Sequence, residues 1–291
     1  FSIKTSLIPV EWKNCKINIL DTPGYFDFVG EVEEAISVAD AAIIVVSGKA
    51  GVEVGAERAW DLCDKYNLPR MIYVSDMDLN DTNYGRTIEA LTELYGPKIV
   101  PFHFAIHEGD KTTGCVSVIE QKGYKWDGKK STPCDVPADC QDDLEQYHET
   151  LMETVAETNE EFMERYFGGD TFTVEEVGEA VRANILDGSV IPVECGISTQ
   201  CSGIENVLDD IVRYMPNPAG RTVTGKNTKT GEDFEAAFDD AQPKSAFIFK
   251  TIVDPFIGRY SLIKVCSGVF KTDETVYDSS LESEMRLGKL Y

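Results

Sequence analysis

The stretch Ile17-Asn18-Ile19-Leu20-Asp21-Thr22-Pro23-Gly24 places an acidic residue and a glycine just after a short apolar run. The run is typical of a buried strand, and the segment that follows has helical spacing, with Val29, Val32, Ile36 and Ala39. An acidic residue at the carboxyl end of a strand can hold Mg²⁺ through water, and a nearby glycine lets a backbone N–H approach a phosphate. Asp21 and Gly24 are therefore candidate nucleotide-binding residues, although Asp-x-Pro-Gly also makes ordinary turns.

Strands and helices alternate downstream of this stretch, which predicts an α/β fold. The apolar runs Ala41–Val46 and Met71–Val74, like Ile17–Leu20 in the stretch above, each precede a segment with helical periodicity. Strand–helix alternation at this interval predicts a parallel sheet covered by helices on both faces. A further strand, Val190–Val193, precedes a helix from about Ile204 to Tyr214. The residues of this last helix that we expect to face inward are Val207, Leu208 and Ile211.

Residues of about 97–188 interrupt the alternation of strands and helices, and we interpret them as an α+β insertion. They contain a predicted hairpin, with strands Cys115–Ile119 and Gly123–Trp126, and a long helix around Leu144–Arg165. The segment Gly123–Lys130 nearly matches the phosphate-binding pattern Gly-x-x-x-x-Gly-Lys-[Ser/Thr]. Because it opens no helix, we interpret it as a hairpin loop and not as a phosphate site.

The sequence changes character at Pro216–Gly220, since proline cannot continue a helix. We place the end of the first domain at residue 218 and predict a polar, acidic linker over 219–242. From residue 243 to 291 the pattern has period two, as in Phe247, Phe249, Thr251 and Val253. This pattern predicts the N-terminal part of an antiparallel β-barrel domain.

Several separate segments resemble the GTPase domain of bacterial elongation factor G. They follow the family order: Asp21–Phe28 with Glu31-Val32, Ala41–Val46, Gly51–Val54, Glu153–Glu161, Val193–Gly196, and Asp254–Arg259 with Ser267-Gly268. The resemblance runs from about Phe1 to about Gly268 and implies a divergent paralogue. It implies a P-loop-type GTPase domain truncated at its N-terminus, whose phosphate cradle lies upstream of Phe1. The full-length parent is then expected to bind GTP and Mg²⁺, and the fragment alone to be inactive.

The resemblance also implies roles for residues near the phosphates. Ser2 falls where the family has the threonine whose hydroxyl binds Mg²⁺, Asp21 would be the carboxylate that holds Mg²⁺ through water, and Gly24 would supply the γ-phosphate amide. The family has a histidine at Tyr25, which orients the attacking water. A phenol can donate or accept a hydrogen bond, and positioning dominates phosphoryl transfer. Tyr25 is thus the candidate catalytic residue of a slower or differently triggered GTPase; a packing role for it stays open.

The guanine-binding pattern of the family, Asn-Lys-x-Asp, appears here as Ser75-Asp76-Met77-Asp78. Asp78 is retained, and its carboxylate can accept from the ring N–H and the amino group of guanine. Ser75 and Asp76 depart from the pattern, which could weaken base binding by a few kcal/mol, at about 0.5–1.5 kcal/mol per neutral hydrogen bond. In the last guanine loop the backbone of Gly196-Ile197 is expected to contact the base.

Composition excludes some other classes of function. The net charge of -24 argues against broad binding of naked nucleic acid, because such binding relies on Lys and Arg. No apolar run approaches the roughly 20 residues that would span a membrane. The 8 cysteines form no Cys-x-x-Cys pattern and are expected to be reduced thiols of a cytoplasmic protein.

Two histidines, His103 and His107, are spaced for metal binding if helical, but they fall on or beside a predicted strand, 99–106. That strand would place both on one face with no third ligand evident, so we favour a structural or surface role for them.

Three functions remain open from the sequence. The favoured one is a translational GTPase that couples GTP hydrolysis to a ribosomal step, translocation or recycling. The second is a ribosome-associated binding protein with a degenerate GTPase site. The third is a ribosomal protection protein of the tetracycline-resistance type.

Overall fold

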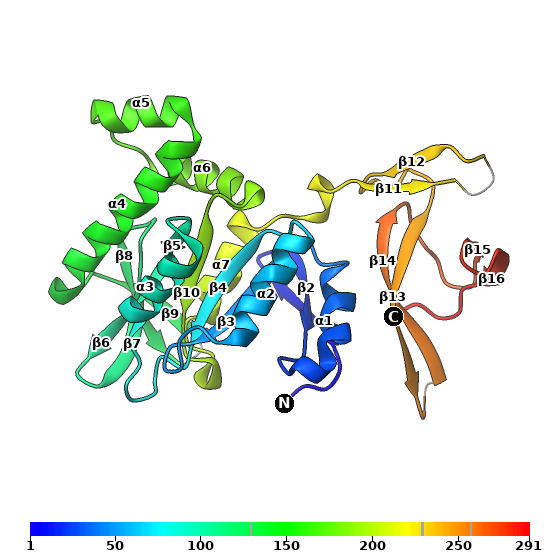
Figure 1. Cartoon of the computed structure of the whole chain (residues 1–291), viewed down its shortest axis with the longest axis horizontal. Helices are drawn as coiled ribbons and strands as arrows, with labels where there is room; N and C mark the ends of the chain where they lie inside the picture. The colour runs from blue at the N-terminus through cyan, green and yellow to red at the C-terminus, as the bar shows by residue number, and fades with distance from the viewer. Residues whose placement is uncertain (129, 228–229, 257) are drawn as a thin grey trace. The chain divides into compact units, whose positions relative to one another are not determined.

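The computed structural model describes residues 1–128, 130–227, 230–256 and 258–291. The chain divides into two compact units, Phe1–Pro216 and Asn217–Tyr291. Figure 1 shows the long helices and the larger sheets in the first unit and antiparallel hairpins in the second. The division falls at the start of the Pro216–Gly220 segment, at which the helical pattern of the sequence stops.

A four-stranded parallel sheet forms the centre of the first unit. Its strands are, in spatial order, β3 (Ala42–Ser47), β4 (Arg70–Ser75), β10 (Ile191–Cys195) and β5 (Ile99–Pro101). Every residue of β4 and of β10 is buried. Strands buried on both faces are typical of parallel sheets, and the predicted α/β sheet is confirmed.

The helices beside this sheet have the predicted positions. They are α2 (Val54–Lys65), α3 (Tyr84–Tyr95) and α7 (Ile204–Tyr214). The buried face of α7 differs from the prediction, because Leu208 and Ile211 are only half-buried. Its buried residues are Asn206, Val207, Asp210 and Tyr214. The buried face thus includes two polar side chains, Asn206 and Asp210, whereas the predicted face held apolar residues alone.

The prediction that the strand ending at Asp21 is buried in the parallel sheet was wrong, because most of its residues are exposed and it pairs elsewhere. This strand is β2 (Cys15–Asp21), which pairs antiparallel with β1 (Ser6–Trp12) in a two-stranded sheet of its own within the described residues. Lys13 and Asn14 connect the two strands with φ values of 45° and 62°. Two positive φ values make the tight turn that favours a hairpin, which explains this pairing. The short helices η1 (Phe26–Phe28) and α1 (Val29–Ile36) follow.

The insertion begins with an antiparallel sheet. Its strands are β6 (His103–Glu108), β7 (Lys111–Ser117), β8 (Lys122–Asp127) and β9 (Lys130–Cys134). The predicted hairpin is confirmed as β7–β8. The segment Gly123–Lys130 lies across β8 and its turn, with Lys129 outside the described residues. A Cβ on Gly123 would lie 2.8 Å from the Cys134 sulfur, at the end of β9, and 2.8 Å from the Asp135 carbonyl oxygen just after it, so protein atoms already fill the space beside this glycine.

Helices complete the insertion after η2 (Ala138–Cys140): they are α4 (Gln141–Thr158), α5 (Glu160–Gly168) and α6 (Val174–Asp187). The prediction of one long helix was wrong. Asn159 has extended φ and ψ of -137° and 112°, and its side chain accepts a hydrogen bond from the Phe162 N–H at 3.0 Å. Asparagine is a strong N-cap, so it ends α4 and begins α5.

The second unit consists of η4 (Pro218–Gly220) and antiparallel hairpins. These are β11 (Val223–Lys226) with β12 (Asp233–Ala236), β13 (Ser245–Asp254) with β14 (Gly258–Ser267), and β15 (Thr275–Asp278) with β16 (Ser283–Arg286). The first hairpin lies inside residues 219–242, where we expected a linker. Ile257, in the turn that matches elongation factor G, lies outside the described residues. The hairpins share no ladder among the residues described, and the barrel stays a prediction.

Candidate functional site

The two candidate base-binding segments meet at the carboxyl edge of the parallel sheet. Strands β4 and β10 are parallel neighbours, with Val74 opposite Cys195. The residues after both strands therefore leave the sheet at the same edge. The Met77 N–H faces the Gly196 carbonyl oxygen at 3.5 Å, which joins the two loops directly. Ser75 and Asp78 thus lie close to Gly196 and Ile197, although they are far apart in the sequence.

Ser75 is buried at the end of β4 and forms contacts within its own loop. Its hydroxyl lies 3.1 Å from Asp76 Oδ2 and 3.4 Å from the Val46 carbonyl oxygen. Its backbone carbonyl accepts from the Gly48 N–H at 2.9 Å. Asp76 has φ +62°, in the left-handed region that aspartate tolerates better than most residues. The two departures from the family pattern therefore form a local turn.

A contact from the insertion also shapes this loop. The Thr112 hydroxyl, on β7, donates to the Met77 carbonyl oxygen at 2.5 Å. His107 Nδ1 lies 3.2 Å from the same hydroxyl. Asp78, the next residue, is exposed to solvent. The sequence held no signal for Thr112, because the contact joins elements that are far apart along the chain.

The loop that begins at Gly196 is tightly packed. A Cβ on Gly196 would lie 2.5 Å from the Tyr73 hydroxyl oxygen and 2.6 Å from the Ser202 carbonyl oxygen. The Ile197 side chain is 2% exposed. The Gly196 N–H donates to the Val74 carbonyl at 3.1 Å, and the Ile197 N–H donates to the Ser202 carbonyl at 3.0 Å. A base contact through either N–H would require that bond to open.

The candidate phosphate-end residues gather at the carboxyl end of β2. The Ser2 hydroxyl donates to Asp21 Oδ2 at 3.0 Å. The Phe1 and Tyr25 rings lie 4.8 Å apart, so the N-terminal segment contacts both Asp21 and Tyr25. Tyr25 is 56% exposed and Gly24 is exposed.

The N-terminal segment is fixed on α1 by Thr5. Its N–H donates to Glu31 Oε2 at 2.6 Å, and its hydroxyl donates to the Glu31 carbonyl at 2.9 Å. Thr5 is buried, at 4% exposure, although it lies close to the chain end. This anchor explains how Ser2 reaches Asp21.

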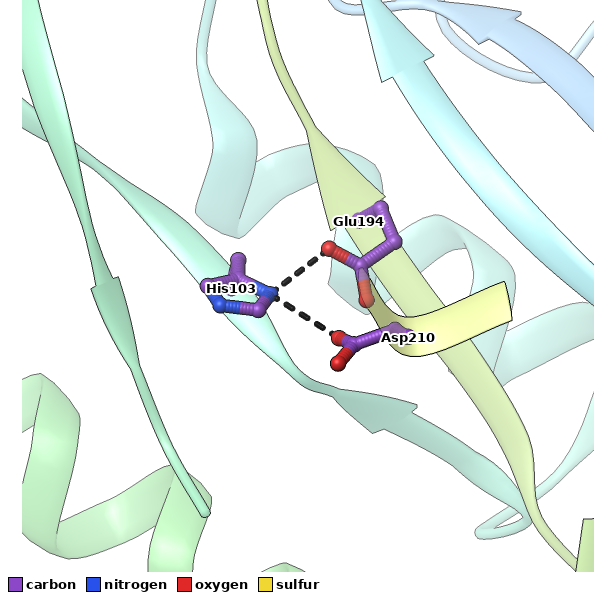
Figure 2. A group of neighbouring side chains, drawn as sticks. All are labelled: His103, Glu194 and Asp210. Atoms are coloured by element: carbon purple, nitrogen blue, oxygen red, sulfur yellow. Dashed lines mark hydrogen bonds and ion pairs between the residues drawn. The ribbon is translucent and has the colours of Figure 1, made fainter. Parts of the chain in front are cut away.

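A second group of polar side chains is buried where β6, β10 and α7 meet. His103 on β6, Glu194 on β10 and Asp210 on α7 point toward one another in Figure 2. His103 Nδ1 lies 2.7 Å from Glu194 Oε2 and 3.4 Å from Asp210 Oδ2. Burial, followed by the neighbouring charge of Glu194, raises the pKa of Asp210 well above its ordinary value. We name these three residues the buried acid–histidine cluster.

The sequence pointed to only one member of this cluster. It identified His103 but paired it with His107, which is exposed and contacts Thr112 instead. Glu194 gave a signal that was overlooked, namely a charged residue within a strand that is otherwise apolar and buried on both faces. Asp210 gave a weaker signal, because it lies three residues after Val207 on the buried face of α7.

Among the residues that the structure describes, no helix combines the length with the apolar composition that crossing a lipid bilayer requires. The absence of a membrane partner, expected from the sequence, stays a prediction.

Comparison with known proteins identifies the family. Residues 1–217 match the family described as the elongation factor Tu GTP-binding domain. A crystal structure of a protein from Thermus thermophilus superimposes with a TM-score of 0.83 at 29% sequence identity. The match covers 98% of this chain and 40% of that protein, so the chain spans less than half of its length. With the matched domain filling the whole first unit, the chain belongs to the family of the elongation factor Tu GTP-binding domain, the GTP-binding domain of translational GTPases.

Proposed function

We propose that this chain is the nucleotide-binding part of an elongation factor G-like GTPase that couples GTP hydrolysis to a ribosomal step, translocation or recycling. The observation that carries the proposal is the meeting of Ser75–Asp78 with Gly196-Ile197 at the carboxyl edge of the parallel sheet. Ligands of open α/β sheets bind at this edge. Asp78 is exposed there and would accept hydrogen bonds from guanine.

The residues at the end of β2 fit a Mg²⁺ ion. Mg²⁺ prefers oxygen ligands, and the Ser2 hydroxyl and the Asp21 carboxylate lie 3.0 Å apart at the surface. When bound, Mg²⁺ neutralises charge on the phosphates of GTP. Gly24 would present its backbone N–H to the terminal phosphate, and the exposed Tyr25 phenol would orient the attacking water.

The two faces of β3 are buried to different extents, and this difference supports the proposal that the phosphate-binding loop lies outside residues 1–291. Ile44 and Val46 are buried on one face of β3, but Ile43 and Val45 on the other face are 43% and 61% exposed. Parallel sheets are normally covered on both faces, as β4 and β10 are here. We propose that a cradle strand and its helix cover Ile43 and Val45 in the parent protein.

The second candidate, a ribosome-associated binding protein with a degenerate site, is favoured by one set of contacts. The N–H groups of Gly196 and Ile197 are both bonded within the fold, and Ser75 and Asp76 form a closed local turn. A ribosomal protection protein of the tetracycline-resistance type would share all of these features. For each candidate the ribosome is the proposed partner and the cytoplasm the proposed compartment.

The deciding experiment uses the full-length gene product with 70S ribosomes. We expect GTP binding and ribosome-stimulated hydrolysis, and we expect Asp21→Asn to lower hydrolysis at least about tenfold, since a Mg²⁺ contact is lost. Asp27→Asn is the matched control, because Asp27 is also an exposed acidic residue, six positions further along the chain. If the wild-type protein binds ribosomes but hydrolyses no GTP, the proposed GTPase function is wrong and the function as a ribosome-associated binding protein takes its place. Release of translation from tetracycline inhibition would identify the protection protein.

A second experiment on the same protein tests the base loop. Restoring the family pattern with Ser75→Asn and Asp76→Lys together should tighten GDP binding and sharpen the preference for guanine over adenine. Equal GDP affinity in the wild type and the double variant would show that the local turn already binds guanine fully.

A further inference from the structure

The buried acid–histidine cluster holds more negative charge than its own groups can balance. Glu194 is 0% exposed and Asp210 is 3% exposed, and both carboxylates face the single imidazole of His103. Glu194 Oε1 has no hydrogen-bond partner within the described chain, and Asp210 Oδ2 has only the His103 ring at 3.4 Å. A buried carboxylate without a partner is costly, so the cluster must take up protons or a cation.

Neighbouring charged groups do not supply that cation. Arg213 lies one turn after Asp210 on α7, but its guanidinium donates to Glu120 Oε1 at 2.7 Å. The other oxygen of Glu120 accepts from the Tyr124 hydroxyl. The charges of Arg213 and Glu120 therefore neutralise one another beside the cluster. No lysine or second arginine contacts the cluster among the residues described.

We propose that His103, Glu194 and Asp210 bind one divalent transition-metal ion, with Zn²⁺ the best match. The three ligand atoms, one ring nitrogen and two carboxylate oxygens, lie within 4.8 Å of one another. Imidazole together with carboxylate is a common donor set for Zn²⁺, and three protein ligands leave a fourth position for water. Magnesium fits less well, because a ring nitrogen is a poor ligand for it.

Of the two distances from His103 Nδ1 to the carboxylates, one must lengthen when the ion binds. Donors on a tetrahedral Zn²⁺ ion lie about 3.3 Å apart, given bond lengths of about 2.0–2.1 Å. The His103–Asp210 distance of 3.4 Å already fits, whereas the His103–Glu194 distance of 2.7 Å is that of a hydrogen bond. Binding would replace the shared proton and open this contact by about 0.6 Å. A glutamate side chain can make that movement by rotating its carboxylate.

The other ring nitrogen of His103 has a neighbour suited to orient the imidazole. Nε2 lies 3.4 Å from the side-chain nitrogen of Asn206, and Asn206 Oδ1 accepts from the Ser131 hydroxyl at 2.7 Å. If the Asn206 amide turns over, its oxygen accepts from Nε2–H, and the Ser131 hydroxyl can accept from its nitrogen. Metal-binding histidines usually donate their second nitrogen in this way. Asn206 and Ser131 are thus positioning residues for His103.

The test measures zinc binding by the reduced 291-residue chain, with isothermal titration calorimetry and elemental analysis. We expect one Zn²⁺ per chain, with at least about a tenfold loss of affinity in Asp210→Asn and in His103→Gln. Asp210→Asn keeps the shape of the side chain, and circular dichroism would check that the variant folds. His107→Gln is the matched control, because His107 is on the same strand, is exposed and lies outside the cluster.

Thiols are the main competing ligands, since all 8 cysteines are free. The absorption spectrum of the wild-type chain loaded with Co²⁺ separates the two ligand types and does not depend on any variant folding. A spectrum without a thiolate charge-transfer band supports the proposal. Sulfur ligation, an absence of stoichiometric zinc, or equal affinity in the wild type, Asp210→Asn and His103→Gln would each overturn it. In the last two cases the cluster holds protons instead.

Discussion

Replacing Gly196 with alanine tests whether the loop after β10 is as closely packed as its geometry indicates. Ordinary contact begins at 3.4 Å, so the Ser202 carbonyl, 2.6 Å from the new Cβ, would have to retreat by about 0.8 Å. That carbonyl accepts from the Ile197 N–H at 3.0 Å, and the Ser202 N–H returns a bond to Ile197 at 3.1 Å. The new methyl group therefore strains the loop and weakens this pair of bonds.

We expect the variant to lose about 2 kcal/mol of unfolding free energy, within the roughly 1–3 kcal/mol typical of overpacking. The Tyr73 hydroxyl, 2.5 Å from the same Cβ, adds to the strain because Tyr73 is 6% exposed and has little room to move. With a urea dependence of about 2 kcal/mol per molar, the unfolding midpoint should fall by about 1 M.

Tryptophan fluorescence is a suitable probe, because Trp12, Trp60 and Trp126 all lie in the first unit and report on it alone. Gly178→Ala is the matched control. Gly178 lies inside α6, and its Cβ would make an ordinary contact of 3.5 Å with the Tyr214 ring. The control should gain about 0.5–1 kcal/mol, since alanine favours a helix over glycine. Equal midpoints for Gly196→Ala and the wild type, or equal losses in both variants, would refute the packing argument.

Three further predictions concern the N-cap of α5, the hydrogen bond between Trp12 and Asp209, and the reactivity of the thiols in the first unit. Asn159→Ala should cost about 0.5–2 kcal/mol and speed hydrogen exchange at the start of α5, because the N-cap bond is lost; unchanged exchange there would contradict the cap. Trp12→Phe should cost about 1 kcal/mol in urea unfolding followed by circular dichroism, since the indole donates to Asp209 Oδ1 at 2.7 Å. Lys13→Ala, which removes only an exposed ion pair to the same carboxylate, should cost less. At pH 8 a thiol reagent should modify the exposed Cys15 in the native chain but not Cys63, whose pKa burial raises to about 11; mass spectrometry showing rapid labelling of Cys63 would contradict its burial.

Local patterns were enough to predict most elements of the first unit. The alternation of strands and helical segments predicted α2 and α3, and the period of apolar residues predicted both ends of α7. These elements depend on neighbours three or four residues away, so the sequence carries their signal directly. The single helix expected around Leu144–Arg165 was wrong because one cap, Asn159, outweighed a continuous periodic pattern.

Part of the candidate nucleotide site could also be predicted from the sequence. A parallel sheet brings the ends of its strands to one edge, so the closeness of Ser75–Asp78 to Gly196 follows once β4 and β10 are identified as its strands. The bonds that already engage Gly196 and Ile197 could not be expected, because their acceptors are chosen by the local path of the loop.

The sequence by itself determined most of the strands and helices of the first unit, the family, and the residues that follow each strand of the parallel sheet. Only the tertiary structure decided that β2 pairs with β1 apart from the parallel sheet, and that His103, Glu194 and Asp210 share one buried position. The physical reason is that periodicity acts over a few residues, whereas strand partners and the burial of a charge depend on contacts between distant segments. His103 and Asp210 are more than a hundred residues apart, and no local pattern relates a histidine on a strand to an aspartate on a helix.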